Sequence, residues 1–123
     1  MTFDETKPGR IIIIEDEPMI ALDLQDVLVD AGFEIAGVAG KLEQALALIA
    51  STIFDAAIVD ANLGGVSSSP AASALAERGL PFIVLSGYSL KQQQAAFPGG
   101  HFLQKPCRPA LLIQVLTGIL PQR

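Results

Sequence analysis

The sequence has few of the features that mark a secreted, membrane-embedded or nucleic-acid-binding protein. It has a single cysteine, Cys107, and therefore no internal disulfide, which favours a reducing cytoplasm. Its hydrophobic runs stay well short of the ~20 residues that a membrane-spanning helix needs. Asp and Glu number 13 against 8 Lys and Arg, so the formal net charge is -5, and no basic face for nucleic acid is present. We therefore expect a cytoplasmic protein without a membrane or nucleic-acid partner.

Length and composition indicate one domain. The chain has 123 residues, of which 50% are hydrophobic, and this is enough for a single core. Its first nine residues are polar and do not resemble a signal peptide. We expect residues 1–9 to be a loose leader and residues 10–123 to form the domain.

Five apolar segments alternate with segments of helical periodicity. The expected strands are residues 10–14, 33–40, 56–59, 80–86 and 101–105. The expected helices are residues 18–31, 41–51, 67–79 and 108–120, with at most a small helix in residues 90–100. Ser69, which precedes Pro70, is the expected N-cap of the third helix. Strands that alternate with helices predict an α/β fold, a (βα)5 parallel sheet with helices on both faces.

Polar side chains stand at the ends of four of these strands. Glu15 and Asp16 follow the first strand, Asp60 the third, Ser86 ends the fourth and Lys105 the fifth. Each residue alone would be ordinary surface polarity or a turn cap. The carboxyl ends of parallel strands meet at one edge, where ligands bind, so the whole set predicts a single polar cleft.

Three carboxylates in one cleft favour a hard divalent cation. Two carboxylates about 4 Å apart repel by about 4 kcal/mol at an effective dielectric constant of 20. Mg²⁺, or Mn²⁺, removes this repulsion and prefers oxygen ligands. We expect the ligands to be Glu15, Asp16, Asp60 and the backbone carbonyl of Asn62.

The same residues suit phosphoryl transfer. Asp60 stands alone at the end of a middle strand, and a carboxylate can act as a nucleophile that forms an aspartyl phosphate. Transfer requires aligned oxygens and neutralised charge. Lys105 would supply positive charge, and the hydroxyl of Ser86 would donate to a phosphoryl oxygen.

This ordered set resembles the response-regulator receiver domain of two-component signalling, over essentially all of residues 10–120. By this resemblance Glu15 and Asp16 match the acidic pair, and Asp60 matches the phosphoryl acceptor. The resemblance implies the flavodoxin-like strand order 2-1-3-4-5. It also implies a histidine kinase or a histidine phosphotransfer protein as the phosphoryl donor.

The resemblance extends to the remaining site residues. Ser86 matches the Ser/Thr that contacts the phosphoryl group, and Lys105 matches the lysine of a Lys-Pro pair whose peptide bond is commonly cis in this family. Such a domain assists its own phosphorylation and dephosphorylation, and we expect no turnover on an external substrate.

A finer likeness concerns a receiver subgroup nicknamed FATGUY. "PFIVLSGYS" is similar to its Pro-Phe-x-Phe-Ala-Thr-Gly-Tyr stretch, with Leu85 and Ser86 in place of Ala-Thr, and "DANLGG" resembles its loop after the acceptor. Members of the subgroup often pair with kinases of the HWE or HisKA2 type, and some act in stress signalling. Phe102 stands where many receivers carry a switch aromatic, and Tyr88 is a second switch candidate.

Two apolar stripes run along the expected last helix. The stripe expected in the core consists of Leu112, Val115, Leu116 and Ile119. The second, roughly opposite stripe consists of Ala110, Ile113, Thr117 and Leu120. A surplus apolar stripe favours a partner surface or a homodimer through this helix.

We interpret the chain as a stand-alone response regulator, because little sequence follows the last expected helix. It would signal by protein contact, or act as a phosphate shuttle or sink. An alternative is a phosphorylation-independent, receiver-like binding module, which need not bind Mg²⁺. A Mg²⁺ phosphohydrolase is a third possibility, but such enzymes usually carry a second Asp two residues after the nucleophile, and here that residue is Asn62.

Overall fold

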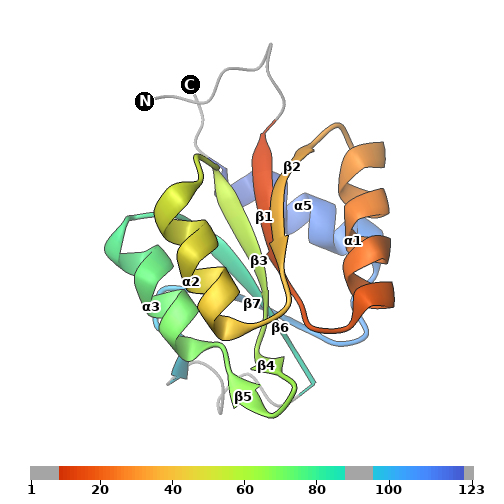
Figure 1. The fold of residues 1–123 in the computed structure, drawn as a ribbon. Helices are drawn as coiled ribbons and strands as arrows, with labels where there is room; N and C mark the ends of the chain where they lie inside the picture. Colours follow the sequence, from red (N-terminus) through yellow and green to blue (C-terminus); the bar gives the residue numbers. More distant parts are fainter. Residues whose placement is uncertain (1–8, 88–95, 121–123) are drawn as a thin grey trace.

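Five parallel strands form the central sheet of the computed structural model, which describes residues 9–87 and 96–120. The strands are β1 (Arg10–Ile14), β2 (Glu34–Ala39), β3 (Ala56–Asp60), β6 (Phe82–Ser86) and β7 (His101–Gln104). Their order is β2-β1-β3-β6-β7, and every neighbouring pair is parallel (Figure 1). This confirms the predicted α/β fold and the order 2-1-3-4-5.

Helices cover both faces of the sheet. They are α1 (Pro18–Asp30), α2 (Leu42–Ser51), α3 (Ser69–Glu77) and α5 (Pro109–Ile119). Helices α2 and α3 lie on one face, and α1 and α5 lie on the other (Figure 1). The small helix expected in residues 90–100 falls largely on residues 88–95, outside the described residues. No helix in the described part of the chain is long and apolar enough to span a bilayer.

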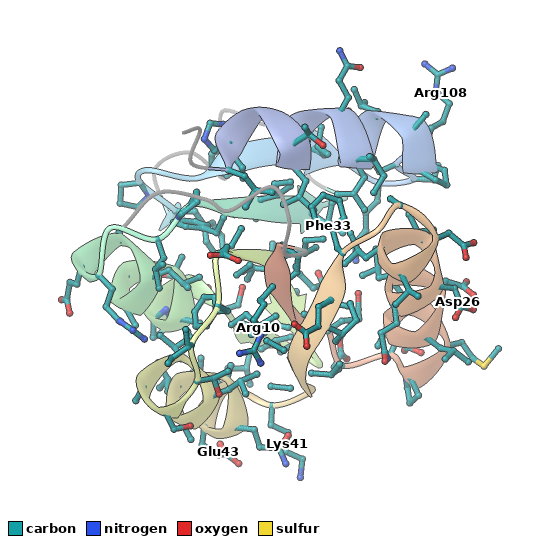
Figure 2. All side chains as sticks on the ribbon, turned by 90° about the horizontal axis from the view of Figure 1, so that it is seen from above. Arg10, Asp26, Phe33, Lys41, Glu43 and Arg108 are labelled. Atoms are coloured by element: carbon teal, nitrogen blue, oxygen red, sulfur yellow. The ribbon has the colours of Figure 1, made fainter. Side chains whose placement is uncertain are left out.

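The strands of the sheet divide their side chains between two cores. In β1, Ile12 and Ile14 pack under α2 and α3, whereas Ile11 and Ile13 pack under α1 and α5, and all four are 0% exposed. This alternation is the period of two that a β-strand imposes. Figure 2 shows the two layers from above, with Phe33 on the side covered by α1 and α5. A strand that is apolar on both faces can carry polar groups only at its ends, and that is where the site residues lie.

A short hairpin, not predicted from the sequence, follows β3. Strands β4 (Asn62–Leu63) and β5 (Val66–Ser67) pair antiparallel, and the hairpin lies beyond the carboxyl end of β3 (Figure 1). Its turn consists of Gly64 and Gly65, whose φ angles are +62° and +93°. Two consecutive residues with positive φ form the type I′ turn that matches the twist of paired strands.

The expected N-cap of α3 was wrong by one residue. Ser68, not Ser69, occupies the N-cap position, and its side chain makes no capping hydrogen bond. Ser69 is instead the first residue of the helix. The Ser68 hydroxyl donates to the carbonyl of Asp60, so a tertiary contact replaces the local cap.

The second apolar stripe of the last helix is smaller than expected. Leu120 belongs to the core and is 6% exposed, because α5 ends at Ile119 and the chain turns to an extended conformation there. Ile113 is half-buried against the same core. Only Ala110 and Thr117 of this stripe are exposed. A homodimer through α5 remains a prediction, and this stripe offers little apolar surface for it.

The connection from β7 to α5 is as predicted. The Lys105–Pro106 peptide bond is cis. Cys107 follows it, half-buried beside the core under α1 and α5, and burial raises the pKa of its thiol.

Candidate functional site

Three acidic side chains converge at the carboxyl edge of the sheet. Glu15 and Asp16 follow β1, and Asp60 is the last residue of the neighbouring β3. One carboxylate oxygen from each lies within 4.8 Å of the others. Glu15 and Asp60 are buried, and Asp16 is half-buried. The sheet thus brings together the three acids that the sequence indicated.

Lys105 reaches the same point from the other side. Its Nζ lies 3.0 Å from Oδ2 of Asp60. The Lys105 backbone N–H donates to the carbonyl of Ser86 at 2.8 Å, which extends the β6–β7 ladder by one bond and fixes where the lysine leaves the sheet. The Asp60 side chain is only 8% exposed and that of Lys105 is 34% exposed, so this ion pair is screened less than a surface pair would be.

The second oxygen of Asp60 faces the following loop. Oδ1 accepts a hydrogen bond from the backbone N–H of Asn62 at 3.2 Å. The side-chain oxygen of Asn62 is already engaged, because it accepts from the N–H of Gly65 at 2.7 Å and closes the hairpin. The backbone carbonyl of Asn62 as a metal ligand remains a prediction.

Ser86 completes the site on the β6 side. It is 2% exposed and shares with Asp60, Asn62 and Lys105 a surface hollow of about 320 Å³. This hollow is open to solvent at the carboxyl edge and leaves room for a small anionic group beside Asp60. Tyr88 lies outside the described residues.

In this cluster, the ionised form of Glu15 is poorly stabilised by the protein. Its Oε2 accepts from the N–H of Glu17 at 3.0 Å, whereas Oε1 is buried and has no hydrogen-bond partner among the described residues. Burial, and secondarily the neighbouring Asp60, raises the pKa of Glu15 from 4.5 to about 7. A buried carboxylate oxygen without a donor, next to two other carboxylates, fits a divalent cation such as Mg²⁺.

The expected switch aromatic on β7 packs inward. Phe102 is half-buried, and its ring lies edge-on to that of Phe97, with centroids 6.5 Å apart and planes at 75°. Offset and edge-on ring pairs are favourable packing arrangements. A switch role for Phe102 remains a prediction.

Ser68 is a site neighbour that the sequence did not identify. Its hydroxyl donates to the backbone carbonyl of Asp60 at 2.6 Å, and the residue is fully buried. It lies within "SSS", residues 67–69, and nothing in that run distinguishes the serine that turns inward. The β4–β5 hairpin determines which serine turns inward, and its Gly64-Gly65 turn could have been predicted from the sequence.

The chain is similar to known proteins over most of its length. The sequence profile of the response regulator receiver domain matches residues 11–117. The transcriptional regulatory protein PdtaR of Mycobacterium tuberculosis (strains CDC 1551 / Oshkosh and ATCC 25618 / H37Rv) is 34% identical over 87 residues, which cover 70% of this chain and 42% of PdtaR. The chain thus spans about two fifths of the length of these curated relatives.

Solved structures have the same fold. SdrG from Sphingomonas melonis Fr1 is 37% identical, with a TM-score of 0.76 over 89% of this chain and 94% of that one. The response regulator PhyR from Brucella abortus is 27% identical, with a TM-score of 0.80 over 92% of this chain and 48% of that one. Together with the profile match over most of the sequence, these similarities show that the chain belongs to the response regulator receiver domain family of two-component signalling.

Proposed function

We propose that this receiver domain accepts a phosphoryl group on Asp60 in a Mg²⁺-dependent reaction and passes the signal on through protein contact. The observation that carries the proposal is the position of the Asp60 carboxylate. It lies between Lys105 Nζ, 3.0 Å away, and the carboxylates of Glu15 and Asp16, at the edge of an open hollow. The donor would be a histidine kinase or a histidine phosphotransfer protein.

The proposed reaction is a displacement at phosphorus. An Asp60 carboxylate oxygen forms a bond to phosphorus while the bond from phosphorus to the donor breaks, and the electron pair leaves with the donor imidazole or, for acetyl phosphate, with acetate. The product is an aspartyl phosphate, which water later hydrolyses. Asp60 is changed and then restored, so no turnover on an external substrate is proposed.

Each neighbour of Asp60 has a role in this scheme. Lys105 offsets the negative charge that builds on the transferring group, and Ser86 donates its hydroxyl to a phosphoryl oxygen. Glu15 and Asp16, with Asp60 and the carbonyl of Asn62, would hold Mg²⁺. The bound ion would neutralise carboxylate charge and orient phosphoryl oxygens.

The test is the intact mass of the protein after incubation with acetyl phosphate and Mg²⁺, with and without EDTA. We expect one added phosphoryl group on the wild type with Mg²⁺ and none with EDTA. Asp60→Asn removes the nucleophile and should stay unmodified. Asp26→Asn is a matched control, because Asp26 is exposed on the outer side of α1 (Figure 2), and it should be modified like the wild type.

Two results would contradict the proposal. Stoichiometric modification of Asp60→Asn would place the acceptor elsewhere. A wild type that is neither modified nor able to bind Mg²⁺ would favour the phosphorylation-independent binding module.

We also propose that the chain is of the FATGUY type and is served by kinases of the HWE or HisKA2 type. The stretches "PFIVLSGYS" and "DANLGG" support this. Replacing acetyl phosphate by phosphorylated kinases of these and of other types in the same assay measures the preference. Equal transfer from all kinase types would contradict the subgroup assignment.

A further inference from the structure

Every polar group of Ser68 is engaged inside the protein. The residue is 0% exposed, and its hydroxyl donates to the carbonyl of Asp60 at 2.6 Å. Its backbone N–H donates to the carbonyl of Ala61 at 3.1 Å. Its own carbonyl accepts from the N–H groups of Ala71 and Ala72 at 2.9 and 3.2 Å. Ser68 therefore joins the end of β3 to the first turn of α3.

The direction of the Ser68 side chain is unusual for its place in the chain. A serine at an N-cap position ordinarily accepts a hydrogen bond from the helix's own N–H groups, which stabilises the helix. Ser68 makes no such bond, although it holds that position. Its hydroxyl donates to the carbonyl of Asp60 instead, so the side chain stabilises the site and does not cap the helix.

The neighbouring serines do not share this contact. Ser67 is exposed, and its hydroxyl oxygen accepts from the N–H of Ser69 at 3.1 Å. The β4–β5 hairpin reverses the chain at Gly64 and Gly65 and so returns Ser68, eight residues after Asp60, to the Asp60 peptide. The hairpin thus delivers one particular hydroxyl to the backbone of the acceptor.

Holding the Asp60 carbonyl constrains the Asp60 carboxylate. The peptide orientation sets the direction of the side chain, and the carboxylate oxygens are positioned against Lys105 Nζ and the N–H of Asn62 at 3.0 and 3.2 Å. Misplacing a reacting group by about 1 Å can cost a hundredfold in rate. We infer that Ser68 is a positioning residue for phosphorylation of Asp60, acting through the Asp60 backbone; this inference rests on the proposed function.

Three substitutions separate a positioning role from a purely structural one. Ser68→Ala removes the hydroxyl. Ser68→Thr keeps a hydroxyl but adds a methyl group at a fully buried position, where extra volume can strain the packing. Ser68→Cys keeps the approximate volume but is a weak donor. Ser51→Ala is the matched control, because Ser51 donates to the carbonyl of Ala47 at 2.8 Å on the exposed side of α2, away from the site.

The measurement is the initial rate of phosphoryl incorporation from acetyl phosphate with Mg²⁺, followed by intact mass. It is made at a temperature where every variant is folded, and the thermal midpoint of each variant is measured separately. We expect the Ser68→Ala rate to fall roughly tenfold, as for a modest misplacement of the nucleophile, and the Ser51→Ala rate to be unchanged. Ser68→Thr should react faster than Ser68→Ala even where its midpoint is lower.

A purely structural role predicts a different order of phosphorylation rates, because the variant with the lowest thermal midpoint would then be the slowest. A wild-type rate in Ser68→Ala, or a Ser68→Thr rate as low as that of Ser68→Ala, overturns the inference. If Ser68→Thr does not fold, Ser68→Cys decides: a slow rate with a retained midpoint supports positioning, and a wild-type rate overturns it. A wild type that takes no phosphoryl group overturns the proposed function and this inference together, whereas a reactive wild type with a fully reactive Ser68→Ala overturns only the inference.

Discussion

Among the three clustered acids, Glu15 is the one whose ionised form is clearly disfavoured. One of its oxygens is buried without a donor among the described residues, and Asp60 lies next to it. The pKa of Glu15 is raised to about 7, mainly by burial. In the absence of a cation, a large share of the protein therefore carries a protonated Glu15 at neutral pH.

This shift predicts how stability depends on pH. A carboxyl whose pKa rises from 4.5 to about 7 on folding does not affect the free energy of unfolding below pH 4.5, where it is protonated in both states. It lowers that free energy progressively as the pH rises from 4.5 to 7, because the unfolded state releases its proton first. Glu15→Gln removes this titration. In EDTA, the free energy of unfolding of the variant relative to that of the wild type should therefore rise by on the order of 3 kcal/mol between pH 4.5 and 7.

The measurement is urea unfolding of both proteins in EDTA at several pH values. Acids outside the cluster titrate equally in both proteins, so the difference reports Glu15 together with Asp60, with which it interacts. Glu43→Gln is a matched control, since Glu43 is exposed on α2. A wild-type minus Glu15→Gln difference that does not change with pH would refute the pKa shift.

Among the elements, the β4–β5 hairpin depends on a backbone shape that only glycine adopts readily. Gly65 has a φ of +93°, and a Cβ added there would meet no atom within 4 Å. Gly65→Ala therefore isolates the backbone cost and should lower the free energy of unfolding by about 1–2 kcal/mol. Gly118→Ala, in α5 and equally free of neighbours, should raise it by up to about 1 kcal/mol.

The same chemical change should thus have opposite signs at two positions, as measured by urea unfolding at a pH where Glu15 is protonated. Gly65→Ala should also slow phosphorylation, since the hairpin leads directly to Ser68. Equal stability effects in the two variants would contradict the assigned backbone conformations.

The sequence predicted helices and strands correctly where a segment was long enough to show a clear hydrophobic pattern. The five main strands and four helices follow from apolar runs and helical periodicity over four residues or more. The hairpin strands have two residues each, too few for an alternation to be visible, and only Gly64-Gly65 marked them. The N-cap of α3 and the place of Leu120 depend on contacts outside their own helices, so no local pattern could determine them.

For the whole molecule, the sheet explains why scattered residues meet. Strands β1, β3 and β6 are buried on both faces, so polar side chains are acceptable only where these strands end. Parallel pairing then places Asp16, Asp60 and Ser86 at one edge. The sequence therefore predicted which residues gather. It could not give the 3.0 Å contact of Lys105 with Asp60 or the inward turn of Ser68, because these depend on how the strands pair and on the hairpin.

This arrangement predicts that Mg²⁺ stabilises the whole domain. A ligand that binds only the folded state adds roughly 1.4 kcal/mol when its free concentration is ten times its dissociation constant, which corresponds to a rise of about 5 °C in the thermal midpoint for a small domain. Protons compete with the cation for Glu15. Because its pKa is about 7, the apparent affinity should be up to about tenfold weaker at pH 6 than at pH 8.

Thermal unfolding with increasing Mg²⁺ at both pH values measures this coupling. Asp16→Asn removes the charge of one expected ligand and should lose most of the rise. Asp26→Asn changes an exposed acid on the outer side of α1 and should keep the rise. A rise of equal size in wild type and Asp16→Asn would mean that Mg²⁺ acts on the net charge of -5 as a whole. A rise that depends on Asp16 and on pH would tie the stability of the domain to the cluster where Asp60 is expected to react.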